Sequence, residues 1–198
     1  MPVSFFPLSG SSTLSTVLIY PGVGYGTQSF VEDRILNGVL KGVDAPVLVA
    51  VAPTASTPYA QVKQEIETFA ADTGTTLKPS VLLGWSGGAQ GVSAANQEGH
   101  AYPSIMLADP SPIVGAASDS RAQMWYQPGN WTGVNAPLAE QQRTLAGTMG
   151  NRATLVENTH NEILDLVVEK AVKKSGKAWV VLVTVSALAF LLWRKVSA

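Results

Sequence analysis

The sequence contains no cysteine, and this absence removes several kinds of chemistry at once. Disulfide bonds, thiolate metal sites and a cysteine nucleophile are all excluded. Histidine is nearly as scarce, with two copies in 198 residues, so imidazole catalysis would have to use His100 or His160. The N-terminal stretch MPVSFFPLSGSS also lacks the basic and long apolar regions of a cleavable signal peptide, and none is predicted.

Charge is sparse and unevenly distributed along the chain. Charged residues make up 14% of the sequence, and the formal net charge is -1. All 14 acidic residues and eight of the 13 basic ones precede residue 173, which leaves this body at -6 and the remaining tail at +5. An acidic body argues against a nucleic-acid partner, whereas a basic and apolar tail indicates a membrane.

The longest apolar run without a charge is AWVVLVTVSALAFLLW, residues 178–193. Lysines precede it, Arg194 and Lys195 follow it, and a tryptophan lies at each end, as in a spanning helix anchored at both interfaces. As a helix it would reach about 24 Å, and snorkelling lysines with local thinning could match the ~30 Å hydrocarbon core. A buried core helix is the alternative. We predict a globular domain over 1–174, placed in the cytoplasm, and a single-pass C-terminal anchor over 175–198.

Short apolar runs alternate with amphipathic or small-residue stretches through the rest of the chain. This alternation predicts an α/β fold with a doubly wound, mainly parallel sheet, and the length leaves no room for a large lid. The expected strands cover residues 16–22, 45–53, 80–85, 103–110, 122–127 and 152–160. The expected helices cover residues 27–41, 57–74, 88–97, 136–149 and 161–174.

A serine flanked by glycines follows the third expected strand. The stretch Gly84-Trp85-Ser86-Gly87-Gly88 fits the pattern G-x-S-x-G between a strand and a small-residue helix, which is the context of a nucleophilic serine. Such a turn lifts the hydroxyl above the sheet edge, and the helix N-terminus beyond it favours developing negative charge. Ser86 is therefore the predicted nucleophile, and a purely structural turn is the alternative.

A serine hydroxyl needs a base to take its proton, and the two histidines offer different positions. His100 lies between a predicted helix and the next strand, which places it at the N-terminal edge of the sheet as an exposed residue. His160 follows the last expected strand and should emerge at the carboxyl edge, together with Ser86. We predict His160 as the base, while helix capping or a merely polar role is the alternative.

A carboxylate must hold the imidazole in the correct tautomer and offset its positive charge. Asp109 ends the strand SIMLAD at the same carboxyl edge. The stretch WYQPGNW after the next strand offers Asn130 but no acid. Asp109 is the predicted third member, Asp119 is the second candidate, and a simple strand-end turn is the alternative role for Asp109.

Three segments, GWSGGAQG, LADPSP and ENTHNEI, resemble the nucleophile elbow, the acid strand and the histidine loop of the α/β-hydrolase superfamily. They occur in the order serine, aspartate, histidine that this superfamily uses. The resemblance spans about residues 16–172, and its acid position is similar to that of the pancreatic-lipase type. It implies acyl-transfer chemistry on carboxylic esters or thioesters, with no metal and no organic cofactor.

The resemblance also implies two backbone donors that bind an oxyanion. One is the N–H of Gly87, the residue after the nucleophile. The other comes from the loop PGVGYG, where Val23 is the first candidate and Gly24 the second. Family members often carry a His-Gly pair in this loop, and this chain has Pro21-Gly22 instead. The loop lacks the spacing and the lysine of a phosphate-binding Walker A motif, so nucleotide binding is not expected.

These features together predict a membrane-anchored serine hydrolase that acts on a small ester or lipid-like substrate. Four aromatic residues could line its pocket or simply pack in the core: Trp85, Trp125, Tyr126 and Trp131. The competing prediction is a non-catalytic structural or scaffolding membrane protein built on a hydrolase-like domain. The altered oxyanion loop and the missing acid after the penultimate strand favour this alternative.

Overall fold

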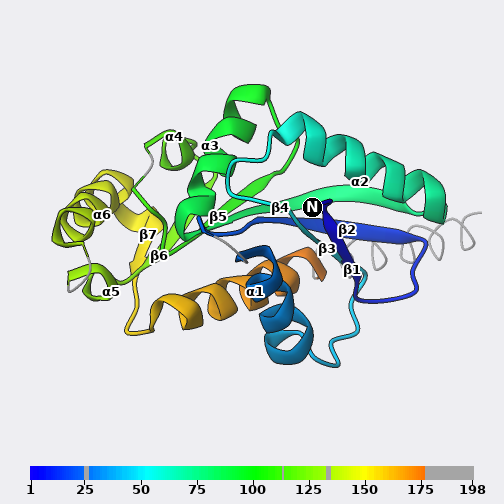
Figure 1. The fold of residues 1–198 in the computed structure, drawn as a ribbon, viewed down its shortest axis with the longest axis horizontal. Helices are drawn as coiled ribbons and strands as arrows, with labels where there is room; N and C mark the ends of the chain where they lie inside the picture. Colours follow the sequence, from blue (N-terminus) through cyan, green and yellow to red (C-terminus); the bar gives the residue numbers. More distant parts are fainter. Residues whose placement is uncertain (25–26, 113, 133–134, 177–198) are drawn as a thin grey trace, which may run out of the picture.

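A seven-stranded sheet organises the chain in a computed structural model that describes residues 1–24, 27–112, 114–132 and 135–176 (Figure 1). The strand order is β1-β3-β2-β4-β5-β6-β7. β1 runs antiparallel to β3, and all the other neighbouring strands are parallel. The strands are β1 (Ser4–Pro7), β2 (Thr13–Tyr20), β3 (Val47–Val51), β4 (Thr76–Trp85), β5 (Ser104–Ala108), β6 (Ala122–Tyr126) and β7 (Ala153–Leu155). The predicted mainly parallel α/β sheet is confirmed.

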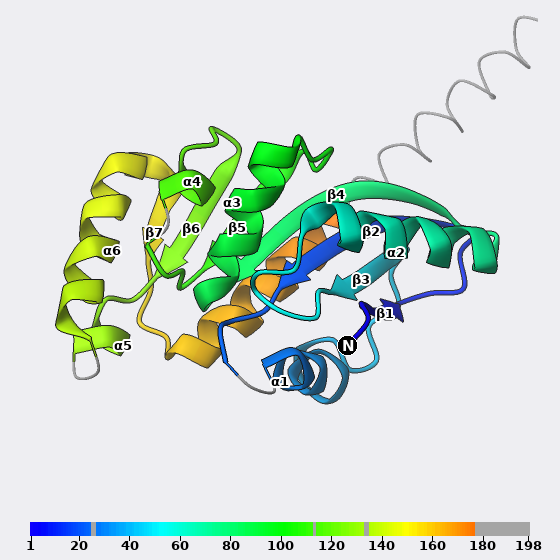
Figure 2. The ribbon, with the colours of Figure 1, turned by 45° about the horizontal axis from the view of Figure 1, so that its top comes forward.

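Helices cover both faces of this sheet, as Figure 1 and Figure 2 show. One face carries α2 (Tyr59–Thr73), α3 (Ala89–Glu98), α4 (Val114–Ala117) and α6 (Ala136–Met149). The other face carries α1 (Thr27–Asp33), its continuation η1 (Arg34–Val39) and a last helix that is described over residues 160–176. Three short helical segments connect these parts: η2 (Ser86–Gly88), α5 (Gly129–Thr132) and η3 (Gly150–Arg152).

Alternate residues of the central strands enter two separate hydrophobic cores. On β4, Leu82 packs in the core on the α2 and α3 side, whereas Val81 and Leu83 pack beneath α1 and the last helix. This follows from the two-residue period of a strand, whose side chains point alternately to opposite faces. Where both faces are covered, a strand can be apolar at consecutive positions, and runs such as VLVAV (47–51) therefore indicate buried parallel strands.

The last strand is shorter than the sequence predicted. β7 ends at Leu155, whereas the expected strand continued to His160. The backbone N of Thr159 donates to Glu162 Oε2 at 2.8 Å, and the backbone N of Glu162 donates to Thr159 Oγ1 at 3.5 Å, which forms a capping box. Because this box satisfies donors in the first turn of a helix, residue 160 begins the last helix instead of ending a strand.

Three short elements were not predicted from the sequence: β1, α4 and α5. Each has only four residues, which is too few for a periodic pattern to be recognised. β1 gains its regular structure from pairing with β3, with Ser4 opposite Val51 and Pro7 opposite Leu48.

The membrane prediction concerns residues 178–193, which lie outside the described residues. Within the part of the chain that the structure does describe, no helix is long and apolar enough to cross a bilayer.

Candidate active site

Ser86 lies in a tight turn between β4 and α3. Its backbone φ angle is +53°, in the left-handed region that residues with a side chain avoid. The turn brings the chain against the end of β2, and a Cβ atom on Gly88 would lie 2.1 Å from the backbone oxygen of Tyr20. Glycine is therefore required at position 88, and the small residues after Ser86 follow from how close these two backbones come.

Asp109 occupies the equivalent place at the end of the next strand. β4 and β5 are parallel neighbours in which Trp85 pairs with Ala108, so Ser86 and Asp109 each follow a register-matched residue. The φ angle of Asp109 is +41°, and these two are the non-glycine residues with positive φ in the described ranges. Backbone strain of this kind persists only where the surrounding structure enforces it, and it clusters at functional sites.

The carboxylate of Asp109 is fully buried, with 0% exposure, and accepts four hydrogen bonds. Its Oδ2 accepts from His160 Nδ1 at 2.7 Å and from Asn130 Nδ2 at 3.0 Å. Its Oδ1 accepts from the backbone N of Gln127 at 3.0 Å and from Gln142 Nε2 at 2.9 Å. Burial alone raises the pKa of Asp109, but these four donors outweigh it and hold the pKa below its ordinary value.

His160 opens the last helix, and its ring is fixed on several sides. Because an ionised carboxylate can only accept, the bond to Asp109 places the ring proton on Nδ1 and leaves the lone pair on Nε2. The ring centroid lies 5.0 Å from that of Trp85 and 4.9 Å from that of Trp131, which meets it nearly edge-on. Trp85 Nε1 also donates to the backbone oxygen of His160 at 3.3 Å.

Trp85 connects His160 with the elbow, since it directly precedes Ser86. The hydrogen bonds among the described residues do not include one between Ser86 Oγ and His160 Nε2, and they give neither atom another partner. Catalytic hydrogen bonds are often long in ligand-free enzymes and shorten only in the complex with substrate. Both atoms are therefore available for a substrate or for each other.

The loop after β2 packs directly against the elbow. A Cβ atom on Gly87 would lie 3.0 Å from the backbone N of Val23 and 2.2 Å from its Cγ2, so only glycine permits this approach. The two predicted oxyanion donors, Gly87 and Val23, thus belong to touching segments. The Val23 side chain is 67% exposed, and the second candidate, Gly24, follows it with φ at +134°.

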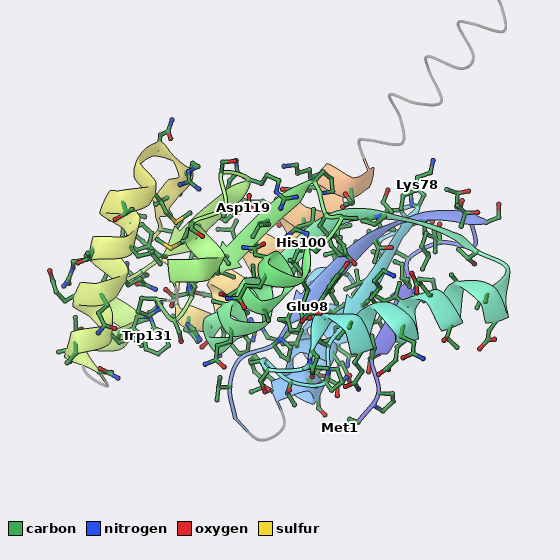
Figure 3. All side chains as sticks on the ribbon, turned by 90° about the horizontal axis from the view of Figure 1, so that it is seen from above. Met1, Lys78, Glu98, His100, Asp119 and Trp131 are labelled. Atoms are coloured by element: carbon green, nitrogen blue, oxygen red, sulfur yellow. The ribbon has the colours of Figure 1, made fainter. Side chains whose placement is uncertain are left out.

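Asp119, the second candidate for the acid, lies at the opposite edge of the sheet with His100 (Figure 3). It pairs with Arg121 at 2.6 Å, which lowers the pKa of Asp119 to about 2, and Arg121 approaches His100 Nε2 at 3.3 Å. The prediction of an exposed His100 was wrong, because its side chain is only 6% exposed. Asn96 Oδ1 and the backbone N of Tyr102 bind its two ring nitrogens, so both polar atoms of the ring have a hydrogen-bond partner although the ring is buried.

Asn130 and Gln142 are partners of Asp109 that the sequence did not reveal. Asn130 stands after β6, where the sequence offered no acid, and also donates to the backbone oxygen of Asn158 at 3.3 Å. Gln142 lies on the buried face of α6 and also donates to the backbone oxygen of Pro110 at 3.2 Å. A glutamine on an otherwise apolar helix face was the one signal in the sequence for this role.

Two of the four aromatic residues considered above, Trp85 and Trp131, contact His160. Trp125 and Tyr126 are partly buried against the two cores, as expected for packing residues. The described residues contain no group of three or more His, Asp or Glu side chains that could hold a metal ion.

Substituting Gln142 by glutamate tests the hydrogen-bond network around Asp109. We expect the free energy of unfolding to fall by about 3 kcal/mol at neutral pH, because a second buried carboxyl then faces Asp109. Repulsion raises the pKa of the introduced carboxyl above its value in the unfolded chain. The loss of unfolding free energy relative to the wild type should therefore be small in acid and should grow as the pH rises. Thermal melts of both proteins between about pH 4 and 8 would measure it. Gln141→Glu, on the exposed side of α6, is the matched control, and an equal loss there would contradict the prediction.

No protein-family model matches the sequence, and no match is found among curated proteins. Among solved structures, poly(aspartic acid) hydrolase-1 from Sphingomonas sp. KT-1 superposes with a TM-score of 0.57 at 13% identity, over 86% of this chain and 92% of its own. The siderophore hydrolase EstB from Aspergillus nidulans gives a TM-score of 0.48 at 11% identity, over 85% and 86%. A structure from work on the metagenome-derived lipolytic enzymes LipS and LipT gives 0.29 at 18% identity, over 57% and 46%. Together with the sheet order, the first of these likenesses shows that this chain has an α/β-hydrolase-like fold.

Proposed function

We propose that this chain is a serine hydrolase that cleaves carboxylic ester or thioester bonds. The observation that carries the proposal is the pair of strained residues, Ser86 and Asp109, at register-matched ends of neighbouring strands. His160, from a distant part of the chain, is hydrogen-bonded to that same aspartate at 2.7 Å. A hydroxyl, an imidazole and a carboxylate at one sheet edge are the groups that acyl transfer requires.

The proposed reaction begins when Ser86 Oγ attacks the carbonyl carbon and His160 Nε2 takes its proton. The resulting imidazolium is stabilised by Asp109, which remains ionised. The tetrahedral intermediate then expels the alcohol or thiol, which receives that proton from His160, and an acyl ester remains on Ser86. Water, deprotonated by His160, attacks this ester, and the bond to Ser86 Oγ then breaks as His160 returns the proton to that oxygen, which releases the carboxylic acid and restores the site.

Negative charge that develops on the substrate oxygen needs donors that are already in place. The backbone N–H groups of Gly87 and Val23 are proposed for this role, because their segments touch beside the nucleophile. One such donor typically contributes a factor of about 10² to 10³ in kcat. No metal or organic cofactor is required by this mechanism.

We further propose that residues 178–193 anchor this domain to a membrane, with the domain on the cytoplasmic side. The support is the uncharged apolar run, its terminal tryptophans and its basic flanks. Small esters and lipid-like esters are both candidate substrates on the sequence alone. The competing function, a non-catalytic membrane scaffold, is favoured by the Pro21-Gly22 departure in the oxyanion loop.

Labelling with a fluorophosphonate tests the nucleophile directly, because this reagent reacts with activated serine hydroxyls. We expect the intact folded protein to be labelled, and mass spectrometry of its peptides to place the adduct on Ser86. Ser56 is an internal control, since it is an exposed hydroxyl in the loop after β3 that makes a hydrogen bond with Thr54. A folded protein that takes up no label, or takes it up on Ser56, would refute the hydrolase and favour the scaffold.

A further inference from the structure

The geometry points to a membrane-docking surface on the sheet edge opposite Ser86, with the candidate active site opening to water on the far side. This inference rests on the proposed anchor at residues 178–193. It deepens the proposed function by narrowing the substrate to an ester dissolved in the aqueous phase.

The end of the last helix is tied to the middle of β4 and to the first residue of β5. Ser175 is fully buried, and its Oγ is 2.8 Å from Ser80 Oγ on β4. Lys174 Nζ donates to the hydroxyl of Ser104, the first residue of β5, at 2.8 Å. Only residues 176 and 177 separate this fixed point from the predicted anchor, and two extended residues reach about 7 Å. The headgroup surface must therefore lie next to this edge.

The candidate active site lies at the other end of the same elements. The last helix begins at His160, and the 15 residues from there to Ser175 rise by about 22 Å. Ser86 follows Ser80 by six residue steps along β4, which corresponds to about 20 Å of strand. In Figure 3, Trp131, which contacts His160, and Lys78 lie on opposite sides of the molecule.

Basic side chains gather where the last helix ends. Lys173 and Lys174 lie in its last described turns, and the sequence continues with Lys177. Lys78 is exposed on β4, two residues before the serine that binds the helix end. Glu169 pairs with Lys173, and Asp119, at the same edge of the sheet, pairs with Arg121. The charge at this edge has the sign that an anionic lipid surface attracts, although the body of the chain is acidic overall.

This orientation decides which esters can reach Ser86. The ester groups of phospholipids lie near the membrane interface, about 20 Å from the nucleophile by the rise of β4. A short tether and a buried helix end prevent the domain from rotating so that Ser86 faces the bilayer. A lipid in the same bilayer is therefore out of reach, whereas a dissolved ester approaches an edge that faces water.

Single cysteines can report this orientation, because the natural chain has none. Ser120→Cys labels the loop before β6, at the proposed docking edge, and Thr132→Cys labels an exposed position of α5 next to Trp131, which contacts His160 at the Ser86 edge. Each full-length variant would carry a donor fluorophore and be inserted into vesicles that contain anionic lipid and an acceptor on the headgroup. We expect stronger energy transfer from position 120 than from position 132.

Two results would overturn the inference. Equal or stronger transfer from position 132 would contradict the orientation, and absence of transfer from both positions would refute the anchor itself. Neither reading depends on catalysis, so the measurement stands even where the hydrolase proposal fails.

A substrate comparison tests the consequence in the same vesicles. Soluble p-nitrophenyl acetate should be hydrolysed, while a fluorogenic phospholipid ester in the bilayer should react at least about a hundredfold more slowly, because its carbonyl is misplaced. Preferential cleavage of the phospholipid would overturn the inference. Failure to cleave either ester, with Ser86 unlabelled by fluorophosphonate, would instead count against the proposed function.

Discussion

Replacing Ser86 by alanine is expected to lower kcat for a soluble ester by on the order of 10⁶-fold, since the residues of a nucleophile–base pair act as a unit. The variant keeps His160 and the backbone donors but has no oxygen to form the acyl ester. Any residual hydrolysis would come from water activated at the site. Steady-state kinetics of the purified variant, with active-site titration to exclude traces of wild-type protein, would measure the loss.

The matched control for this prediction is Ser56→Ala. It removes an exposed hydroxyl from the loop after β3, and its activity should equal that of the wild type. Thermal melts of both variants would show whether the fold is kept, because alanine at position 86 must still adopt a positive φ angle. A folded Ser86→Ala protein that retains activity would eliminate the proposed mechanism.

Asp109→Asn is expected to lower kcat by about 10⁴-fold while the variant still binds substrate. An amide can donate its N–H to His160 Nδ1, which moves the ring proton to Nε2 and removes the lone pair that the base needs. The same NH₂ group then faces the Nδ2 donor of Asn130, which loses this acceptor. Activity and stability should therefore fall together, unlike in Ser86→Ala.

The pH dependence of stability shows how much of the stability loss in Asp109→Asn comes from removing the charge of the carboxylate. The folded pKa of Asp109 is lowered, so its contribution to stability is present above the pKa of the unfolded carboxyl and is lost as the pH falls through the folded pKa. The stability difference between the wild type and Asp109→Asn should shrink correspondingly in acid. Asp119→Asn is the control at the opposite edge, and loss of hydrolysis there with a fully active Asp109→Asn would reverse the assignment.

Elements with strong local signals were predicted closely from the sequence. Helix α6 covers Ala136–Met149, the range expected. Asn135 accepts from the backbone N of Leu138 as an N-cap, and Gly150 follows the last turn, so both ends are set by neighbouring residues. The buried parallel strands were predictable for a similar reason, because burial on both faces leaves continuous apolar runs.

Features that depend on contacts distant in sequence were not predictable in this way. Asn130 and Gln142 donate to Asp109 only when α5 and α6 pack beside the end of β5. No local sequence pattern predicts these contacts, because the residues are far apart in the chain. The burial of His100 depends in the same way on Asn96 and on the turn before β5. His160 lies at the sheet edge that the sequence predicted, but it begins a helix and does not end a strand. The capping box that starts this helix falls within the range predicted as the last strand.

The partners of Asp109 have a consequence for folding during synthesis. Every donor to this carboxylate comes from a later part of the chain, and the last to leave the ribosome is the imidazole of His160. Until residue 160 has emerged and docked, this buried carboxylate lacks one of its four hydrogen-bond donors, which is costly in a protein interior. A nascent chain would therefore complete this network only late in its synthesis, and the proposed hydrolysis would begin only once the last helix has docked.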